Sequence, residues 1–435
     1  MFGKALMAGV LALSLASTAS AQTNRVDGIR PDAPQLAARG KQAVGVGTLT
    51  LVNKGQVNVP AVRAGQPNPT YDRSLTVEVW YPGSLPEGAR AGVEYHTLTR
   101  DGKTPATFHG SATRFIAPDA SGAPYPLVIL SHGYPGNRIL MAHFGENLAS
   151  KGYVVASIDH KESLYQDQTA FGGTLLNRAL DDLFVLNEID RLSKGSSGFL
   201  AGLVDASRTG IIGYSMGAYG ALNLVGAGVT QAAVRSALAP ANELLGMRAA
   251  GDPRYTASLE PRVKAVVAIA PWGFNAGLWD AAGLAGVKTP VFFMAGSVDA
   301  TAGYNPGVRN LFEGTVNADR YLLTFANGGH SVAAPIPAPR EVSGPGSTTL
   351  GHYTDAVWDQ VRSNNVAQHF ATAFLGKHLK ADAGMDSFLN VIENGGAGKY
   401  SVEANGTPRA DHTYWKGFAN NTAVGLTLEH RTPGK

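Results

Sequence analysis

Residues 209–217 read TGIIGYSMG, and this stretch decides the fold of the chain. The apolar residues 209–212 have the composition of a buried strand, and the small residues 218–224 that follow favour a helix. A Gly-x-Ser-x-Gly pentapeptide between a strand and a helix is typical of a nucleophile elbow, a turn so tight that glycine is needed two residues before and after the serine. Because the chain holds 53 glycines, the pentapeptide could also occur by chance. The strand before it and the helix after it make the signal specific. The stretch therefore predicts a nucleophilic serine at Ser215.

The composition narrows the class of protein. The chain has 435 residues, of which 44% are hydrophobic, and it contains no cysteine. Disulfides, thiolate metal sites and cysteine nucleophiles are therefore excluded, and stability has to come from a hydrophobic core. The formal net charge of +3 is nearly balanced, so it gives no reason to expect a nucleic acid or an anionic membrane as a partner.

The first residues have the pattern of an export signal. Lys4 precedes the short apolar run 5–16, and a small-residue site ends at Ala21. This order is typical of a signal peptide cleaved after Ala21, and the apolar run is shorter than the roughly 18–20 residues that span a bilayer. We predict a signal peptide at residues 1–21, an exported protein that is periplasmic or secreted, and no stable membrane insertion.

Buried strands and amphipathic helices alternate through most of the chain. Apolar runs of strand length lie at residues 125–131, 153–158, 209–212, 263–270, 291–295 and 320–325. Such alternation predicts an α/β fold with a mostly parallel, doubly wound sheet and helices on both faces. The patterns at 46–51 and 75–81 predict antiparallel strands at the N-terminal edge of this sheet, followed by a long connection over residues 83–124.

Several segments lie outside this alternation. Residues 22–43 lack apolar periodicity, and we expect a flexible lead-in there. The main domain is expected at residues 44–380, and within it residues 228–262 form an insertion after the nucleophile helix, a candidate lid over the cleft. A helical apolar pattern at residues 353–380 predicts a long helix packed on the sheet, and residues 381–435 are expected to form a C-terminal extension.

A serine hydroxyl is a weak nucleophile, so Ser215 needs an imidazole base and a carboxylate that orients the base. Asp299 follows the strand at 291–295, and His330 follows the strand at 320–325. Because the carboxyl ends of parallel strands lie at one edge of a sheet, loops from these strands can converge on Ser215. We predict Ser215, Asp299 and His330 as the catalytic triad.

Other residues compete for these roles. Asp280 and Asp252 are the alternative acids, and further histidines lie in the terminal helix region, where a surface or core role is expected, at positions 352, 369 and 378. The run 159–162, Asp-His-Lys-Glu, is interpreted as a solvated loop or a polar cleft edge. We find no His-Glu-x-x-His pattern, and the glycine run 45–47 lacks the third glycine of a nucleotide site. We therefore expect neither a metal nor a cofactor.

Ester hydrolysis also needs donors for the oxygen that becomes negative in the tetrahedral intermediate. One expected donor is the backbone N–H of Met216, which directly follows the nucleophile. The other is expected from the 132–136 loop, which reads HGYPG and follows the strand at 125–131. We choose the N–H of Tyr134, because Pro135 has none.

Five stretches together resemble one branch of the α/β-hydrolases: residues 126–134, 148–156, 213–217, 270–272 and 328–331. The branch comprises platelet-activating-factor acetylhydrolases, polyester hydrolases of the cutinase type and bacterial proteins named predicted dienelactone hydrolases. The resemblance covers about residues 75 to 335 and implies the α/β-hydrolase fold and ester hydrolysis by the predicted triad. By similarity to polyester hydrolases, it also implies Tyr134 and Trp272 as aromatic walls of the acyl site.

The chain departs from this branch in two respects. Dienelactone hydrolases use a cysteine nucleophile, which this sequence lacks. Polyester hydrolases are shorter and lack both the insertion at 228–262 and the long tail, so these additions are candidates for narrowing the cleft.

These observations predict an exported serine esterase, lipase-like, that cleaves carboxylic esters through an acyl-enzyme intermediate. The expected partner is a small-molecule or lipid-like ester, with polyesters as a further candidate. Because one triad serves several acyl groups, a β-diketone C–C hydrolase or a peptidase remains an alternative. A non-catalytic binding protein with this fold is the third hypothesis.

Overall fold

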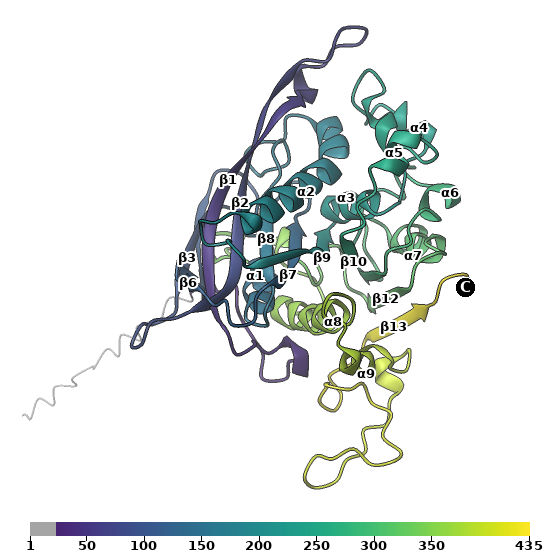
Figure 1. Ribbon diagram of the computed structural model, residues 1–435. Helices are drawn as coiled ribbons and strands as arrows, with labels where there is room; N and C mark the ends of the chain where they lie inside the picture. The colour runs from purple at the N-terminus through teal and green to yellow at the C-terminus, as the bar shows by residue number, and fades with distance from the viewer. Residues whose placement is uncertain (1–22) are drawn as a thin grey trace, which may run out of the picture.

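The computed structural model describes residues 23–435, so the predicted signal peptide at residues 1–21 lies outside the described residues. The described chain forms a mixed eleven-stranded sheet and a separate two-stranded hairpin, with helices on both faces of the large sheet (Figure 1). The α/β architecture predicted from the alternating strand and helix patterns is confirmed.

The central strands are the apolar runs identified in the sequence. They are β7 (Tyr125–Ser131), β8 (Val154–Asp159), β9 (Val204–Tyr214), β10 (Val263–Ile269), β11 (Val291–Gly296) and β12 (Arg320–Phe325), which pair in parallel in the order β12-β11-β10-β9-β7-β8. Successive side chains of a strand face opposite sides, so a strand covered on both sides is apolar throughout. In β7, Val128 and Leu130 belong to the core beneath α1 and α8, whereas Leu127 and Ile129 belong to the core beneath α2 and α3.

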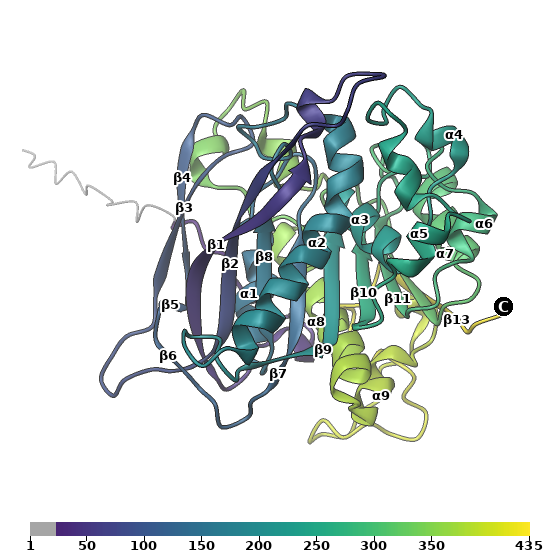
Figure 2. The same cartoon turned by 45° about the horizontal axis from the view of Figure 1, so that its top comes forward.

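Antiparallel strands form both edges of the sheet. β1 (Ala43–Val57) and β2 (Thr70–Ser84) form a long antiparallel pair, and β2 also pairs antiparallel with β8. The short β5 (Thr113–Arg114) pairs with β1, and the short β6 (Ala117–Pro118) pairs with β2. At the opposite edge, β13 (Leu426–Arg431) pairs antiparallel with β12. Figure 2 shows β13 on the side of the molecule away from β5 and β6. The C-terminal extension expected at residues 381–435 therefore completes the sheet.

The region between residues 83 and 124 differs from the long connection that we expected. It contains β3 (Val93–Leu98) and β4 (Pro105–Gly110), which form an antiparallel hairpin outside the large sheet. The tip of this hairpin, residues 99–104, reaches the loops around residues 135 and 353. The hairpin is therefore positioned to contribute to the edge of the sheet where the parallel strands end.

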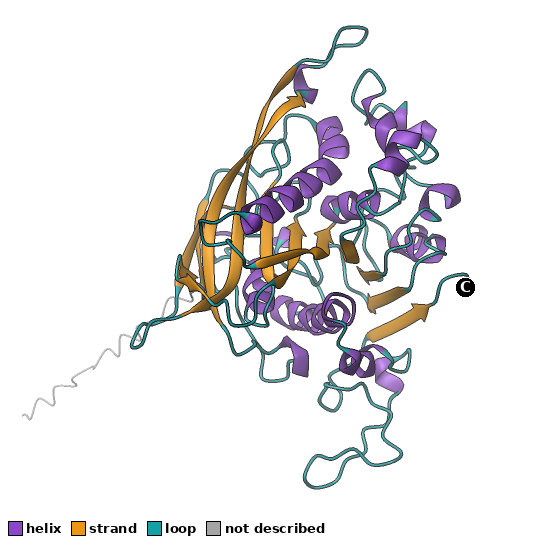
Figure 3. Cartoon of the chain, in the orientation of Figure 1, coloured by secondary structure: helices purple, strands orange, loops and turns teal. Residues whose placement is uncertain are grey.

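Two pairs of longer helices cover the sheet (Figure 3). α2 (Phe171–Lys194) and α3 (Met216–Leu224) pack on one face, and α1 (Ala142–Ala149) and α8 (Gln360–Lys380) on the other. The helix predicted over 353–380 begins only at Gln360, because the Asp359 carboxylate accepts the N–H of Arg362 and caps the first turn. The short helices are α4 (Gln231–Val234), α5 (Pro253–Ala257), α6 (Ala281–Leu284), α7 (Arg309–Gly314) and α9 (Asp386–Leu389). Within residues 23–435, no helix is long and apolar enough to cross a membrane.

The segment expected to be a flexible lead-in is packed against the domain from residue 24 onward. Val26 and Ala37 are buried, and the side chain of Asn147 in α1 donates a hydrogen bond to the carbonyl of Ala37. The backbone N–H of Leu36 donates to Nδ1 of His369 in α8. These polar contacts are made to residues far along the chain, which the local pattern of residues 22–43 does not reveal.

Candidate active site

The nucleophile elbow has the tight geometry predicted from its glycines. Ser215 lies between β9 and α3 with φ 53° and ψ −112°, a strained conformation for a residue with a Cβ. A Cβ on Gly213 would lie 2.5 Å from the nitrogen of Ala218, and one on Gly217 would lie 1.9 Å from the carbonyl oxygen of Ser131. Any side chain at either glycine would therefore push the serine loop away from its neighbours.

Three side chains from separate loops meet at the end of the sheet. His330 Nε2 lies 3.0 Å from Ser215 Oγ, and His330 Nδ1 lies 2.8 Å from Asp299 Oδ2. The ring of Tyr214 packs against the His330 ring, with 5.2 Å between the centroids. The structure thus brings together Ser215, His330 and Asp299, the residues predicted as the catalytic triad, which we call the cleft triad.

Asp299 has two roles in this geometry. Its Oδ1 accepts the backbone N–H groups of Thr301 and Ala302, which leaves Oδ2 for His330. Burial raises the pKa of the Asp299 carboxyl, but the hydrogen bond and charge of His330 and the two N–H groups outweigh this effect, so its pKa lies below the ordinary value. The carboxylate therefore stays ionised and fixed in the orientation that holds His330 in place.

The two alternative acids lie elsewhere and cap short helices. Asp280 accepts the N–H of Gly283 at the start of α6, and Asp252 accepts the N–H of Arg254 at the start of α5. Neither carboxylate faces His330, so Asp299 is the acid that the geometry supports.

Ser215 and His330 line a cleft of about 780 Å³. One side is formed by three aromatic rings, which we call the aromatic wall: Tyr134, Phe171 and Trp272. The Phe171 ring lies edge-on to both others, with centroid distances of 5.1 Å to Tyr134 and 5.6 Å to Trp272. The structure places both predicted substrate residues at the cleft and adds Phe171, the first residue of α2, which no sequence motif singled out.

The rest of the cleft lining includes a polar group of residues, which we call the polar wall. It is formed by Arg100 from the β3–β4 hairpin and by the 348–356 loop, which contributes His352, Gly351 and three threonines. Asp355 in this loop accepts the backbone N–H of Gly329 at 2.6 Å and so ties the loop to the segment that carries His330. The histidine at 352, expected to have only a surface or core role, therefore lines the cleft.

The insertion at residues 228–262, our candidate lid, does not line this cleft. It packs beside the end of α3, where Arg248 Nε donates to the side chain of Asn223 and Tyr255 donates to the carbonyl of the same residue. The 348–356 loop takes the rim position that we had expected for the insertion.

The two expected oxyanion donors, Tyr134 and Met216, both border the cleft. Within residues 23–435, neither backbone N–H has an acceptor from the protein. Met216 is the first residue of α3, so its N–H is one of the unpaired donors at a helix N-terminus. Both donors are therefore available to a bound oxygen.

Arg178 of α2 fixes the 132–136 loop from the side away from the solvent. Its guanidinium donates to the carbonyl oxygens of His132 and Gly133, the latter at 3.1 Å. In a trans peptide the C=O and the following N–H point in opposite directions. Because Arg178 holds the Gly133 carbonyl, the N–H of Tyr134 in the same peptide unit is directed away from Arg178.

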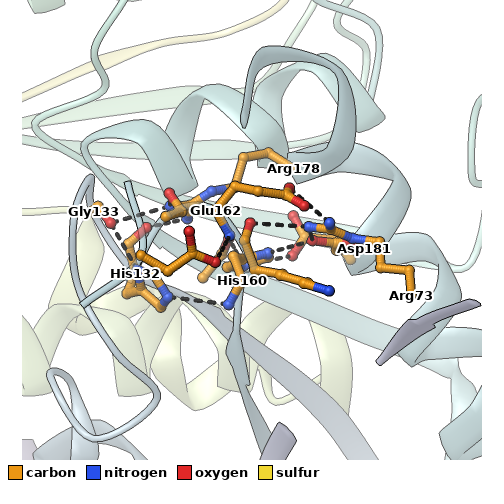
Figure 4. A network of polar contacts seen from close by, with 12 residues as sticks. Arg73, His132, Gly133, His160, Glu162, Arg178 and Asp181 are labelled. Carbon is orange, nitrogen blue, oxygen red and sulfur yellow. Dashed lines mark hydrogen bonds and ion pairs between the residues drawn. The ribbon is translucent and has the colours of Figure 1, made fainter. Parts of the chain in front are cut away.

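A buried polar network surrounds Arg178 (Figure 4). Arg73 pairs with Asp181 through two hydrogen bonds of 2.7 and 2.9 Å and with Glu162 at 2.7 Å, and His160 Nδ1 lies 3.0 Å from Asp181. Burial lowers the pKa of Arg178 and raises that of its neighbour Asp182, and the attraction between the two opposes both shifts. The 159–162 run, interpreted as a solvated loop or cleft edge, contributes His160 and Glu162 to this buried network instead.

Two charged residues on the buried face of α2 are the sequence signal for this network. Arg178 and Asp182 occupy positions on the face of α2 that otherwise carries the buried residues Leu175, Leu186 and Ile189. Charged residues at such positions are buried only when they are paired. The pattern therefore indicates an internal ion pair, although it does not tell which loop the pair supports.

Possible metal ligands are scattered in this structure. Within the described part of the chain, no group of three or more His, Asp or Glu side chains is arranged to hold a metal ion.

Over part of its length, this chain is similar to known cutinases and esterases. A family model described as PET hydrolase-like matches residues 88–245, which include the 132–136 loop and Ser215. Cutinase 2 of Thermobifida cellulosilytica is 28% identical over 178 residues, 41% of this chain and 49% of that protein. Cutinase cut1 of Thermobifida fusca is also 28% identical over 178 residues, 41% of this chain and 40% of that protein. The chain thus spans about half or less of the length of these relatives.

Two further comparisons agree with this grouping. Platelet-activating factor acetylhydrolase of Canis lupus familiaris is 35% identical over 78 residues, 16% of this chain and 18% of that protein. The structure of a ferulic acid esterase from Streptomyces cinnamoneus superposes with a TM-score of 0.53 at 21% identity, covering 80% of this chain and 94% of the other. The resemblance predicted from the sequence motifs and the α/β-hydrolase fold are confirmed.

Proposed function

We propose that this protein hydrolyses carboxylic esters through a covalent acyl-enzyme intermediate on Ser215. The observation that carries the proposal is the 3.0 Å distance from His330 Nε2 to Ser215 Oγ at a cleft of about 780 Å³. A cleft of roughly 300–1,000 Å³ suits a small-molecule ligand. The match of residues 88–245 to the PET hydrolase-like family model and the similarity to cutinases support the same reaction class.

In the first half of the reaction, Ser215 Oγ attacks the ester carbonyl carbon while His330 Nε2 takes the hydroxyl proton. Asp299 stabilises the imidazolium that forms. The carbonyl oxygen becomes negative and accepts the N–H groups of Met216 and Tyr134. When the tetrahedral intermediate collapses, the alcohol leaves with the proton from His330 and the acyl group remains on Ser215.

In the second half, His330 takes a proton from a water molecule, which attacks the acyl carbon. The same two donors bind the oxygen of the second tetrahedral intermediate. Its collapse releases the carboxylic acid and returns the proton to Ser215 Oγ. No group beyond these residues and water is needed to balance the reaction.

The aromatic wall is proposed to bind the apolar part of the substrate. Tyr134 and Trp272 contribute half-buried rings beside Ser215, and Phe171 lies between them. Because both aromatic and polar side chains line the cleft, we propose small-molecule or lipid-like esters as substrates, with polyester segments as a candidate to be tested. The export pattern of residues 1–21 supports action in the periplasm or outside the cell.

The test is covalent labelling combined with an ester panel. A fluorophosphonate should add to the protein once, on Ser215, and the Ser215→Ala variant should stay unlabelled. Hydrolysis of 4-nitrophenyl esters from acetyl to long acyl chains, with a polyester film and a matched amide, then defines the substrate. Labelling at another residue, or ester turnover that persists in Ser215→Ala, would overturn the proposal.

A further inference from the structure

Arg100 is the feature of the cleft that ester hydrolysis alone leaves unexplained. It comes from the tip of the β3–β4 hairpin, far from the triad loops in sequence, and it is half-buried in the polar wall. It is the sole lysine or arginine among the described residues that line the cleft. A cation at a site that needs no cation for the reaction indicates a role in substrate recognition.

The guanidinium of Arg100 is largely free of protein partners. A guanidinium has five N–H donors. One of these five, at Nη1, donates to the carbonyl of Pro135 at 2.9 Å. Separately, the backbone N–H of Arg100 donates to the Tyr353 hydroxyl at 3.0 Å. Within residues 23–435 the guanidinium has no other acceptor, and no carboxylate lies within 4 Å of it. These two contacts hold the side chain at the cleft and leave its other donors available.

The two nearest acids are committed to other partners. Asp101 accepts two backbone N–H groups and two threonine hydroxyls within its own turn. Asp355, the acid that lines the cleft, accepts the N–H groups of Gly329, Val357 and Trp358. Neither carboxylate is therefore available to neutralise Arg100.

We propose that the substrate is an ester that also carries a carboxylate, and that Arg100 binds this carboxylate. The inference rests on the proposed ester hydrolysis at Ser215. The planar guanidinium fork matches the two oxygens of a carboxylate, and a lone cation suits a single negative charge. We expect the apolar part of the same molecule to contact the aromatic wall. Its ester carbonyl then faces Ser215.

The test compares charged esters with neutral counterparts of the same shape. One pair, 4-acetoxybenzoate and 4-acetoxybenzamide, has the charge on the alcohol side. The other pair, mono-4-nitrophenyl adipate and its terminal amide, has the charge on the acyl side. For each pair the readout is the ratio of kcat/KM for the acid to kcat/KM for the amide, which cancels general effects of a mutation on the enzyme.

In Arg100→Gln this ratio should fall about tenfold or more in at least one pair, because a hydrogen bond to a charged group contributes enough to change kcat/KM by that factor. Arg100→Lys should retain part of the preference, since it keeps the charge but loses the fork. Arg90→Gln, which removes an exposed cation outside the cleft, is the matched control and should leave both ratios unchanged.

An unchanged ratio of acid to amide kcat/KM in Arg100→Gln would overturn the proposal. This holds whether kcat/KM for both esters of a pair stays the same or falls by the same factor. An equal fall would show that Arg100 only supports the Pro135 loop. Failure of the proposed function looks different, because the neutral amide-bearing esters would then also resist the native enzyme or react equally in Ser215→Ala.

Discussion

The cleft triad and a second Ser-His-Asp arrangement in the same molecule have nearly the same hydrogen-bond lengths. In the second arrangement, which we call the buried triad, Ser131 Oγ lies 2.9 Å from His160 Nε2, and His160 Nδ1 lies 3.0 Å from Asp181 Oδ2. The corresponding distances in the cleft triad are 3.0 and 2.8 Å. Distances among three side chains therefore do not by themselves distinguish a catalytic group from a structural one.

The surroundings of the two triads differ. Ser215 sits on a strained elbow that opens into the cleft, whereas Ser131 is a regular β7 residue with no exposed surface. Asp181 also forms the two-pronged ion pair with Arg73, so its charge is used to stabilise the interior. Access for a substrate and free N–H donors, rather than the triad geometry, support the proposal that the cleft triad is the reactive one.

The sharpest test of this comparison replaces each serine. Ser215→Ala should lower kcat for 4-nitrophenyl acetate by about 10⁴–10⁶-fold, because the nucleophile is lost. Ser131→Ala should keep kcat within about threefold, since it removes only a buried hydrogen bond with a net contribution of about 1 kcal/mol. Steady-state kinetics and urea unfolding of both variants measure the two effects. A comparable loss of kcat in Ser131→Ala would mean that the buried triad takes part in the reaction.

Replacing each aspartate should separate rate from stability. Asp299→Asn should lower kcat about 10⁴-fold, because the amide holds the imidazole in the wrong tautomer. Asp181→Asn should instead lower the free energy of unfolding by about 3–5 kcal/mol, because it leaves Arg73 incompletely paired in the interior. Kinetics per labelled active site and urea unfolding distinguish the outcomes, and a reversal of the two patterns would contradict the assignment.

Arg178 connects the buried network to the cleft, so its replacement should affect both regions moderately. Arg178→Lys keeps the charge near Asp182 but cannot donate to the carbonyls of His132 and Gly133 in the same fork. We expect kcat per fluorophosphonate-labelled site to fall about 10–100-fold with KM little changed, since the Tyr134 donor is misplaced in the transition state. A fall in the labelled fraction alone, with kcat per site retained, would indicate a purely structural role.

Stability in acid should depend on the buried histidines of both regions. Burial lowers the pKa of the His143, His160, His352 and His369 imidazoles to about 3. In the unfolded chain these groups titrate near 6.5, so between about pH 6.5 and 3 the unfolded state binds more protons than the folded state. Stability is therefore present above pH 6.5 and is lost as the pH falls toward 3, by up to about 1.4 kcal/mol per pH unit for each histidine.

His143 allows this slope to be tested cleanly. Both of its ring nitrogens are buried and have no hydrogen-bond partner in the part of the chain that the structure describes, and its ring packs against Phe144. His143→Phe should remove about one of the protons that are taken up on unfolding in acid, so the unfolding free energy should depend less steeply on pH. Stability at neutral pH should change little. The measurement is urea unfolding between pH 7 and 4, with the native protein as control. An unchanged slope would show that His143 is protonated in the folded protein.

The sequence supported the prediction of the elbow and the triad because their signals are local. Gly213 and Gly217 are required by contacts within one strand-turn-helix unit, and each triad residue directly follows an apolar strand. Parallel strands place all such loops at one edge of the sheet. The order of strands along the chain was therefore enough to predict that Ser215, Asp299 and His330 meet.

Other parts of the cleft depend on contacts between distant segments. Arg100 reaches the polar wall because a hairpin outside the main sheet folds over it, and the 348–356 loop is held there by Asp355. The insertion at 228–262 packs on α3 rather than over the cleft, although its composition is equally compatible with a lid. Neither periodicity nor composition records which surface such a segment covers.

The sequence by itself determined the α/β alternation, the elbow and the residues of the cleft triad, since strand periodicity and tight-turn sterics act between neighbours in the chain. Only the tertiary structure decided that β13 closes the sheet, that His160 and Asp181 are interior, and that Arg100 lines the cleft with Ser215. These features result from burial and pairing between separate segments of the chain, where the free energy depends on the partner segment and not on the local sequence.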